Sequence, residues 1–128
     1  DYIPDHIKYL YCYKNELTSL PKLPESLIHL YCYDNKLTSI PKLPESLIHL
    51  NCRNNKLTSL PILPENLEHL NCNHNKLTSI PKLPISLRSL YCQYNNNLPY
   101  EITINNYKEH NNKIKLIKRK EILSKICT

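Results

Sequence analysis

The stretch that decides the fold is LYCYDNKLTSIPKLPESLIH, residues 30–49, because close variants of it precede and follow it. The chain repeats itself every 20 residues in the pattern LxxLxCxxNxLTSLPxLPxS, without a shift of register across five copies. Such self-similarity indicates an array of stacked units, each of which contacts only its neighbours. The equivalent cysteines are Cys12, Cys32, Cys52, Cys72 and Cys92, and the asparagines that follow them are Asn15, Asn35, Asn55, Asn75 and Asn95.

Each repeat contains one short strand. In the second repeat, Leu30 and Cys32 alternate with polar or aromatic residues at 29, 31 and 33, and a period of two is typical of a strand buried on one side. We therefore expect the leucine and cysteine columns to face the core and the histidine and tyrosine columns to face solvent.

The other side of each repeat is an extended return segment. Pro41 and Pro44 exclude an α-helix there, because proline fixes φ and removes a backbone donor, so a polyproline-like conformation is expected. Where the strand ends, the side chain of Asn35 is expected to bond backbone groups of its own repeat and of the next one.

A 20-residue unit with the pattern LxxLxCxxN is identified as a leucine-rich repeat. We predict a leucine-rich repeat solenoid with short parallel β-strands on the concave face, an extended convex side and a C-terminal helical cap. Residues 1–99 are expected to form five repeats, the N-terminal one incomplete, and residues 100–128 a capping segment with a helix over 106–126. Six aliphatic residues of this helix are expected to close the last coil: Ile114, Leu116, Ile117, Ile122, Leu123 and Ile126.

The pattern LPxLPxxLxxLxxxxNxLTxLP over residues 4–99 resembles the leucine-rich repeats of effector proteins that enteric bacteria inject into host cells. Repeats with cysteine in the strand also resemble leucine-rich repeat proteins of giant viruses that infect amoebae. The resemblance implies a setting in the host cytoplasm. Several bacterial effectors carry a separate ubiquitin-ligase domain with a catalytic cysteine. We do not expect that activity here, because 28 residues follow residue 100 and no motif surrounds Cys127.

Five of the 6 cysteines share one position of the repeat, so we expect a column of buried, free thiols. A disulfide and a thiolate metal site are the alternatives, but parallel side chains seldom reach the disulfide dihedral, and one column does not surround a zinc ion. Free thiols and the absence of Asn-x-Ser/Thr sequons favour an intracellular protein. No apolar run reaches about 18 residues, so no membrane span is predicted.

The exposed columns of the sheet are the candidate binding site, because they vary between repeats while the core columns are nearly constant. Tyrosine and arginine are enriched at the centres of protein interfaces. We predict that an unidentified protein, a host protein if the chain is viral or an effector, binds there without a cofactor. The predicted contact residues are Tyr11, Tyr13, His29, Tyr31, Tyr33, His49, Arg53, His69 and Tyr91.

The three histidines among them have a second interpretation. Stacked imidazoles bind a divalent metal in some sites, and they repel one another when protonated. No carboxylate completes a metal-binding set beside them, so no metal site is predicted. Catalysis is not predicted either, because the chain has 0 glycines for a phosphate-binding loop, Asp34 is the one carboxylate on this face, and a shallow sheet offers no pocket.

The C-terminal segment suggests an alternative function. After residue 100 the chain holds seven of the 17 Lys and Arg residues and three of the 11 Asp and Glu residues, which is +4 of the net charge of +6. A basic run of this kind binds nucleic acid or an anionic surface in some proteins and is a solvated helix face in others. The residues concerned are Lys113, Lys115, Lys118, Arg119 and Lys120.

A second alternative is self-association through the first strand. Residues 3–7 match the Leu-Pro-Glu-Ser-Leu of later repeats, so the chain begins inside a repeat, and we expect further sequence upstream. If none packs there, the strand over residues 9–13 exposes an unpaired edge, and such an edge favours pairing with a second copy in a homodimer.

Overall fold

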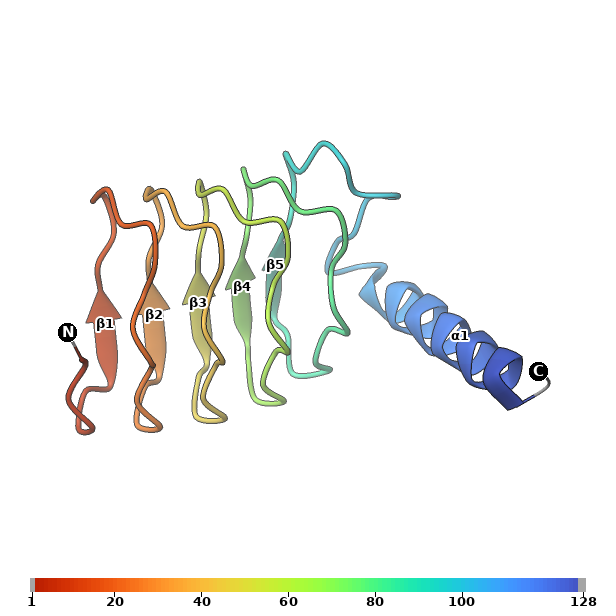
Figure 1. Ribbon diagram of the computed structural model, residues 1–128, viewed down its shortest axis with the longest axis horizontal. Coiled ribbons are helices and arrows are strands. Elements are labelled where there is room, and N and C mark those ends of the chain that lie inside the picture. Colours follow the sequence, from red (N-terminus) through yellow and green to blue (C-terminus); the bar gives the residue numbers. More distant parts are fainter. Residues whose placement is uncertain (1, 127–128) are drawn as a thin grey trace.

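The computed structural model describes residues 2–126. Five strands form one parallel sheet in chain order: β1 Tyr9–Tyr11, β2 His29–Tyr31, β3 His49–Asn51, β4 His69–Asn71 and β5 Ser89–Tyr91. Each strand pairs with the next so that every residue faces the one 20 positions later. The chain therefore winds as a solenoid, and helix α1, Tyr107–Ile126, extends from its end (Figure 1). The predicted solenoid is confirmed.

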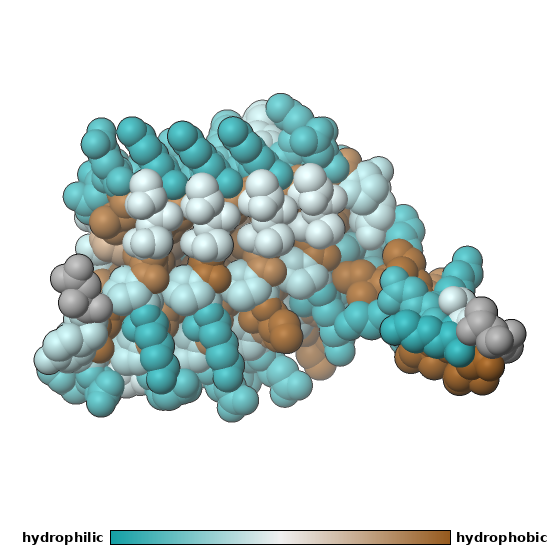
Figure 2. Space-filling view, in the orientation of Figure 1, coloured by the Kyte–Doolittle hydropathy of each residue, from teal (hydrophilic) through white to brown (hydrophobic). Residues whose placement is uncertain are grey.

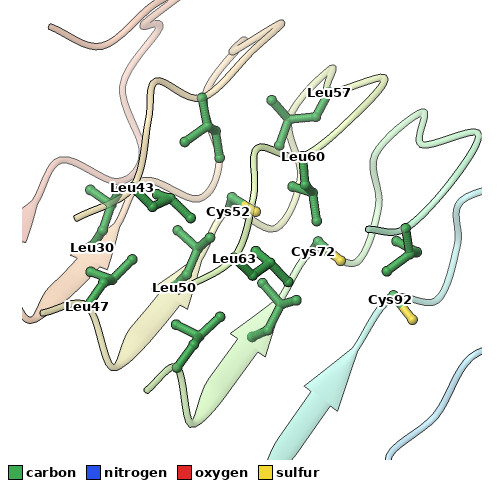
Figure 3. Close-up of a cluster of buried hydrophobic side chains, with 14 of the residues drawn as sticks. Leu30, Leu43, Leu47, Leu50, Cys52, Leu57, Leu60, Leu63, Cys72 and Cys92 are labelled. Atoms are coloured by element: carbon green, nitrogen blue, oxygen red, sulfur yellow. The ribbon is translucent and has the colours of Figure 1, made fainter. Parts of the chain in front are cut away.

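The core is a continuous strip of side chains between the sheet and the return segments (Figure 3). Leu50 and Cys52 at β3 are 1% and 0% exposed, and Leu63 of the return segment belongs to the same cluster. Between consecutive strands the described chain contains no helix, as expected from the two prolines in each coil. Equivalent side chains pack at strand spacing, about 4.8 Å, so the apolar columns run along the whole solenoid.

The cysteine column consists of free thiols at residues 12, 32, 52, 72 and 92. Burial, and secondly the neighbouring Cys12, raises the pKa of Cys32 to about 12. Burial also raises the pKa of Cys52 well above its ordinary value, and the thiols on either side act in the same direction. A thiol that does not ionise is a poor nucleophile and a poor metal ligand, so these cysteines serve to fill the core.

After each strand from β2 to β5, a buried asparagine ties its coil to the preceding coil: Asn35, Asn55, Asn75 and Asn95. The Nδ2 of Asn55 donates to the carbonyl oxygens of Cys32 at 3.1 Å and Cys52 at 3.0 Å, and also to the carbonyl of Arg53 at 3.3 Å. Its Oδ1 accepts from the N–H of Leu37 at 3.0 Å. The sequence predicted that this side chain would bond the next coil, and that prediction is wrong. It bonds the preceding coil, because the free backbone groups of each turn point toward the C-terminal end of the solenoid, where the asparagine of the following coil lies.

Each strand is followed by a residue in the left-handed region. These residues have φ between 54° and 58°: Lys14, Asp34, Asn54, His74 and Tyr94. The conformation costs a non-glycine residue about 1–2 kcal/mol. It is held in place by the next coil, as where the N–H of Asp34 donates to the carbonyl of Arg53 at 3.0 Å. The turn ends the strand and sets these side chains along one rim of the sheet.

A serine on the return side links three pairs of neighbouring coils. The hydroxyl of Ser46 contacts the carbonyls of Glu25 at 2.7 Å and Leu27 at 2.6 Å, and Ser26 and Ser86 make the equivalent bonds. The third coil has Asn66 at this position, and within residues 2–126 it forms no hydrogen bond of this kind. The return side therefore has one weaker junction, between the second and third coils.

The last coil is covered by the segment that leads into α1. His110 is 4% exposed, and its Nε2 donates to the carbonyl of Pro81 at 3.1 Å, so in the neutral ring Nδ1 accepts from the hydroxyl of Tyr100 at 2.7 Å. The amide of Asn111 bonds both the N–H of Leu83 at 2.8 Å and its carbonyl at 2.7 Å. The helix is thus anchored at its first turn.

The prediction that the aliphatic residues of the helix close the last coil is wrong. Beyond the anchored turn α1 extends away from the solenoid (Figure 1), and five of those residues are 50–72% exposed: Leu116, Ile117, Ile122, Leu123 and Ile126. Ile102 and Tyr107, at 3% and 7% exposure, cover the end of the core in their place. The reason lies in the aliphatic side chains themselves, which are spread around the helix and give it no single apolar face to dock.

Replacing Cys52 by Ser is expected to lower the free energy of unfolding by ~1–3 kcal/mol, because a hydroxyl would be buried without a partner. Urea unfolding monitored by circular dichroism measures the change. The matched control is Cys12→Ser in the first coil, where the thiol is only partly buried and a smaller loss is expected. Equal stability of Cys52→Ser and the parent would contradict the buried column.

Replacing Asn66 by Ser is expected to raise the free energy of unfolding by ~0.5–1.5 kcal/mol, because it restores the missing link between the second and third coils. The reverse change, Ser46→Asn, removes an existing link and is expected to lower it. Thermal unfolding of both variants checks the pair. A loss of stability in Asn66→Ser would show that the serine links do not stabilise the return side.

Candidate functional site

The outward side chains of the sheet stack in columns because the strands are in register. The rings of Tyr11 and Tyr31 lie 5.0 Å apart at 24°, and those of Tyr13 and Tyr33 lie 4.7 Å apart at 1°. The guanidinium of Arg53 continues the second column, 5.5 Å from the centre of the Tyr33 ring. The first two coils and the start of the third therefore carry a platform of four tyrosines and one arginine, which we call the tyrosine platform.

A histidine column runs beside this platform. The rings of His29, His49 and His69 are separated by 4.2 Å at each step, and Tyr9 meets His29 edge-on at 4.9 Å. The Nδ1 of His69 lies 2.6 Å from the hydroxyl of Ser89. The Nδ1 of His29 is buried and has no hydrogen-bond partner within the described chain.

The surroundings of His49 disfavour its charged form. Burial lowers the pKa of His49, the neighbouring His69 and His29 lower it further, and Glu68 opposes them. A column of neutral rings packs closely, whereas protonated rings at 4.2 Å would repel one another. The column therefore favours the neutral form of His49.

The predicted contact residues fall into two groups in space. The tyrosine platform and the histidine column lie together over β1 to β4, as the strand register requires. Tyr91 on β5, 51% exposed, is separated from the other tyrosines by Asn51 and Asn71 in its column. It does not join the platform.

Two further contacts lie along the rim of this face. The left-handed turns carry a second stack, in which the rings of His74 and Tyr94 lie 4.4 Å apart at 8°. At the same rim, Asn54 donates to the carboxylate of Asp34 at 2.8 Å. Both contacts join residues 20 positions apart, because the repeat places successive side chains of one column side by side.

The basic residues proposed as a nucleic-acid site lie away from the sheet, on α1. Lys113 is placed over the ring of Tyr100 at 4.0 Å, and the other four are exposed along the helix. Among residues 2–126, no three His, Cys, Asp or Glu side chains are arranged to hold a metal ion. Within the same residues, α1 is not apolar enough to cross a membrane. Cys127 lies outside the described residues.

Comparisons with known proteins agree with this geometry. Residues 45–84 match the family model described as Leucine Rich repeats (2 copies). The structure of YopM from Yersinia enterocolitica WA-314 matches 73% of this chain at 38% sequence identity, with a TM-score of 0.72. The fold is a leucine-rich repeat solenoid. This chain spans only 21% of that YopM chain, and no curated protein matches it.

The two matches bear on the earlier predictions in different degrees. They support a leucine-rich repeat protein of the bacterial-effector type, and they show no relation to giant viruses. Leucine-rich repeat proteins generally bind other proteins and are typically non-enzymatic scaffolds. The expectation of a protein-interaction module is supported, and neither match identifies a partner or a binding face.

Lowering the pH is expected to destabilise the chain through His49. Because its pKa is lower in the folded state, the unfolded chain binds more protons as the pH falls through the ordinary value of 6.5, so stability is full above that pH and is lost below it. His49→Asn should therefore lose less stability than the parent between pH ~7.5 and ~5. Melting temperatures at both pH values test this, and an identical loss in both proteins would contradict it.

Proposed function

We propose that this chain is a non-enzymatic module that binds a partner protein through the exposed face of its sheet. The observation that carries the proposal is the tyrosine platform, because it gathers large, exposed side chains on a rigid surface. Tyr11 and Tyr13 are 55% and 41% exposed and lie in adjacent columns. The proposed contact residues are those of the platform and the histidine column, with Tyr91 further along the sheet: Tyr11, Tyr13, His29, Tyr31, Tyr33, His49, Arg53, His69 and Tyr91.

The stacking defines how the platform meets a partner. In a column the ring faces cover one another, so Tyr31 lies between Tyr11 and the next coil and offers mainly its edge and hydroxyl. A partner would therefore meet rows of hydroxyl groups and ring edges. Tyrosine provides large contact area with few rotatable bonds, and here stacking restrains those bonds further. The platform consequently loses little conformational entropy on binding.

The effector-type resemblance supports a host protein as the partner and the host cytoplasm as the place of binding. YopM has the same fold over the matched repeats. An origin in a giant virus stays a prediction from the strand cysteines. Two other functions also stay predictions: nucleic-acid binding by the basic residues of α1, and pairing through the outer edge of β1, with which no strand pairs in residues 2–126.

Affinity capture from a eukaryotic cell lysate tests the proposal. The parent is compared with a Tyr11→Ser/Tyr31→Ser/Tyr33→Ser variant, whose fold is checked by circular dichroism. Tyr2→Ser is the matched control, because Tyr2 is 82% exposed and lies outside the sheet. We expect a protein that the parent and the control retain and the triple variant loses, with a loss of affinity of at least ~10-fold.

Two results would contradict the proposal. Equal capture by the parent and the triple variant would remove the tyrosine platform as the site. If that capture were also abolished by nuclease, or weakened steeply between ~50 and ~200 mM salt, the basic residues of α1 would be the binding site.

A further inference from the structure

Beyond Asn111 and Lys113, which contact Leu83 and Tyr100, helix α1 protrudes from the solenoid (Figure 1). Its 20 residues span about 30 Å, and in proteins most of the stability of a helix comes from packing of its apolar side chains. Five aliphatic side chains along it are 50–72% exposed. Figure 2 shows hydrophobic side chains along the protruding part of the helix. A surface that covers these side chains would stabilise the helix.

A groove of about 700 Å³ lies on the return side of the solenoid, at the junction of the second and third coils. Pro61, Ile62 and Leu63 form much of its wall, and Ile62 is 89% exposed. The groove coincides with Asn66, which lacks the serine link of the other coils. The groove therefore lies where asparagine replaces the serine of the repeat.

The departures from the repeat change both hydrophobicity and charge on this side. Ile62 occupies the position of Lys22, Lys42 and Lys82, and Ile85, 84% exposed, occupies that of Glu25, Glu45 and Glu65. Because lysine is missing from the third coil, Glu65 lacks the basic residue three positions earlier that Glu45 has in Lys42. Within the described chain neither glutamate takes part in an ion pair. The groove thus combines exposed isoleucine with carboxylates.

The helix offers the complementary chemistry. It carries seven Lys and Arg residues against two Glu residues, mixed with its exposed leucines and isoleucines. We propose that α1 of a second copy of this chain docks in this groove, its aliphatic side chains against Ile62 and its basic side chains beside Glu45 and Glu65. If two copies exchange helices reciprocally, the contact forms twice and the assembly closes as a two-fold dimer.

A second copy fits the helix better than nucleic acid does. Five of the seven basic residues lie within about 120° of the helix circumference, but Ile122 and Ile126 lie on the same arc, so basic and aliphatic side chains share one face. Phosphates would neutralise one side and leave the leucines and isoleucines in water. The groove covers apolar and basic side chains together.

Analytical ultracentrifugation of the purified full chain from ~1 μM to ~1 mM tests the proposal. The key variant is Ile62→Lys/Ile85→Glu, because it places at both positions the residues that the other coils carry there, and the fold should be kept. We expect the parent to associate and this variant to have a dissociation constant at least ~10-fold higher. Leu116→Gln/Leu123→Gln tests the helix side and should weaken association likewise.

The matched control is Tyr31→Ser, which changes the sheet face and is expected to leave association unchanged. A photo-crosslinking residue at position 62 should join residues 107–126 of another copy. A parent that stays monomeric throughout, association that Ile62→Lys/Ile85→Glu does not weaken, or a cross-link to any other segment would each overturn the proposal. Because this surface lies away from the tyrosine platform, none of these results bears on the protein-binding proposal.

Discussion

The hydrogen bonds of one buried asparagine in each coil after the first are the interaction on which the rest of this structure depends. At the end of a strand the chain must turn sharply, and the turn leaves backbone carbonyl and N–H groups without partners inside the coil. Asn55 meets four of them, three as donor and one as acceptor, across two coils. Without this side chain the buried N–H of Leu37 would lose its partner, which costs about 1–3 kcal/mol, while the three carbonyls would each keep a second bond.

The same turn also holds a residue in the left-handed region, and this has a functional consequence. Lysine, histidine and tyrosine all adopt the conformation here, although glycine or asparagine would do so at lower cost. The backbone contacts to the next coil hold the turn whatever the side chain is. Positions along the rim and across the sheet are therefore free to vary, and the chain has placed aromatic side chains there, in stacks such as His74 and Tyr94.

The hydrogen bonds between coils on the return side are less strictly required than those of the buried asparagines. Its links are single serine hydroxyls at partly exposed positions, and the third coil lacks one of them. The core leucine Leu67 that follows Asn66 is nevertheless 0% exposed, so the substitution is absorbed at the surface. Residues that differ from the repeat pattern, such as Ile62, Asn66 and Ile85, lie at positions whose side chains are not needed to hold the backbone. This is the physical reason why the variable positions, and the groove among them, are candidates for binding.

The sequence by itself determined the parallel sheet, the buried leucine and cysteine columns, and the outward columns of tyrosine and histidine, because a period of 20 residues with an alternation of two leaves one way to stack the coils. It also indicated that the tyrosines would lie together, since equal repeat positions become neighbours. Only the tertiary structure decided which coil each asparagine bonds, how the rings stack, and where α1 points. Those features depend on the direction in which free backbone groups face and on which side chains reach the core. Because the aliphatic residues of α1 lie on every side of the helix, their spacing does not indicate which face packs against the solenoid. Its anchoring by Tyr107, His110 and Asn111 could therefore not be predicted from the sequence pattern.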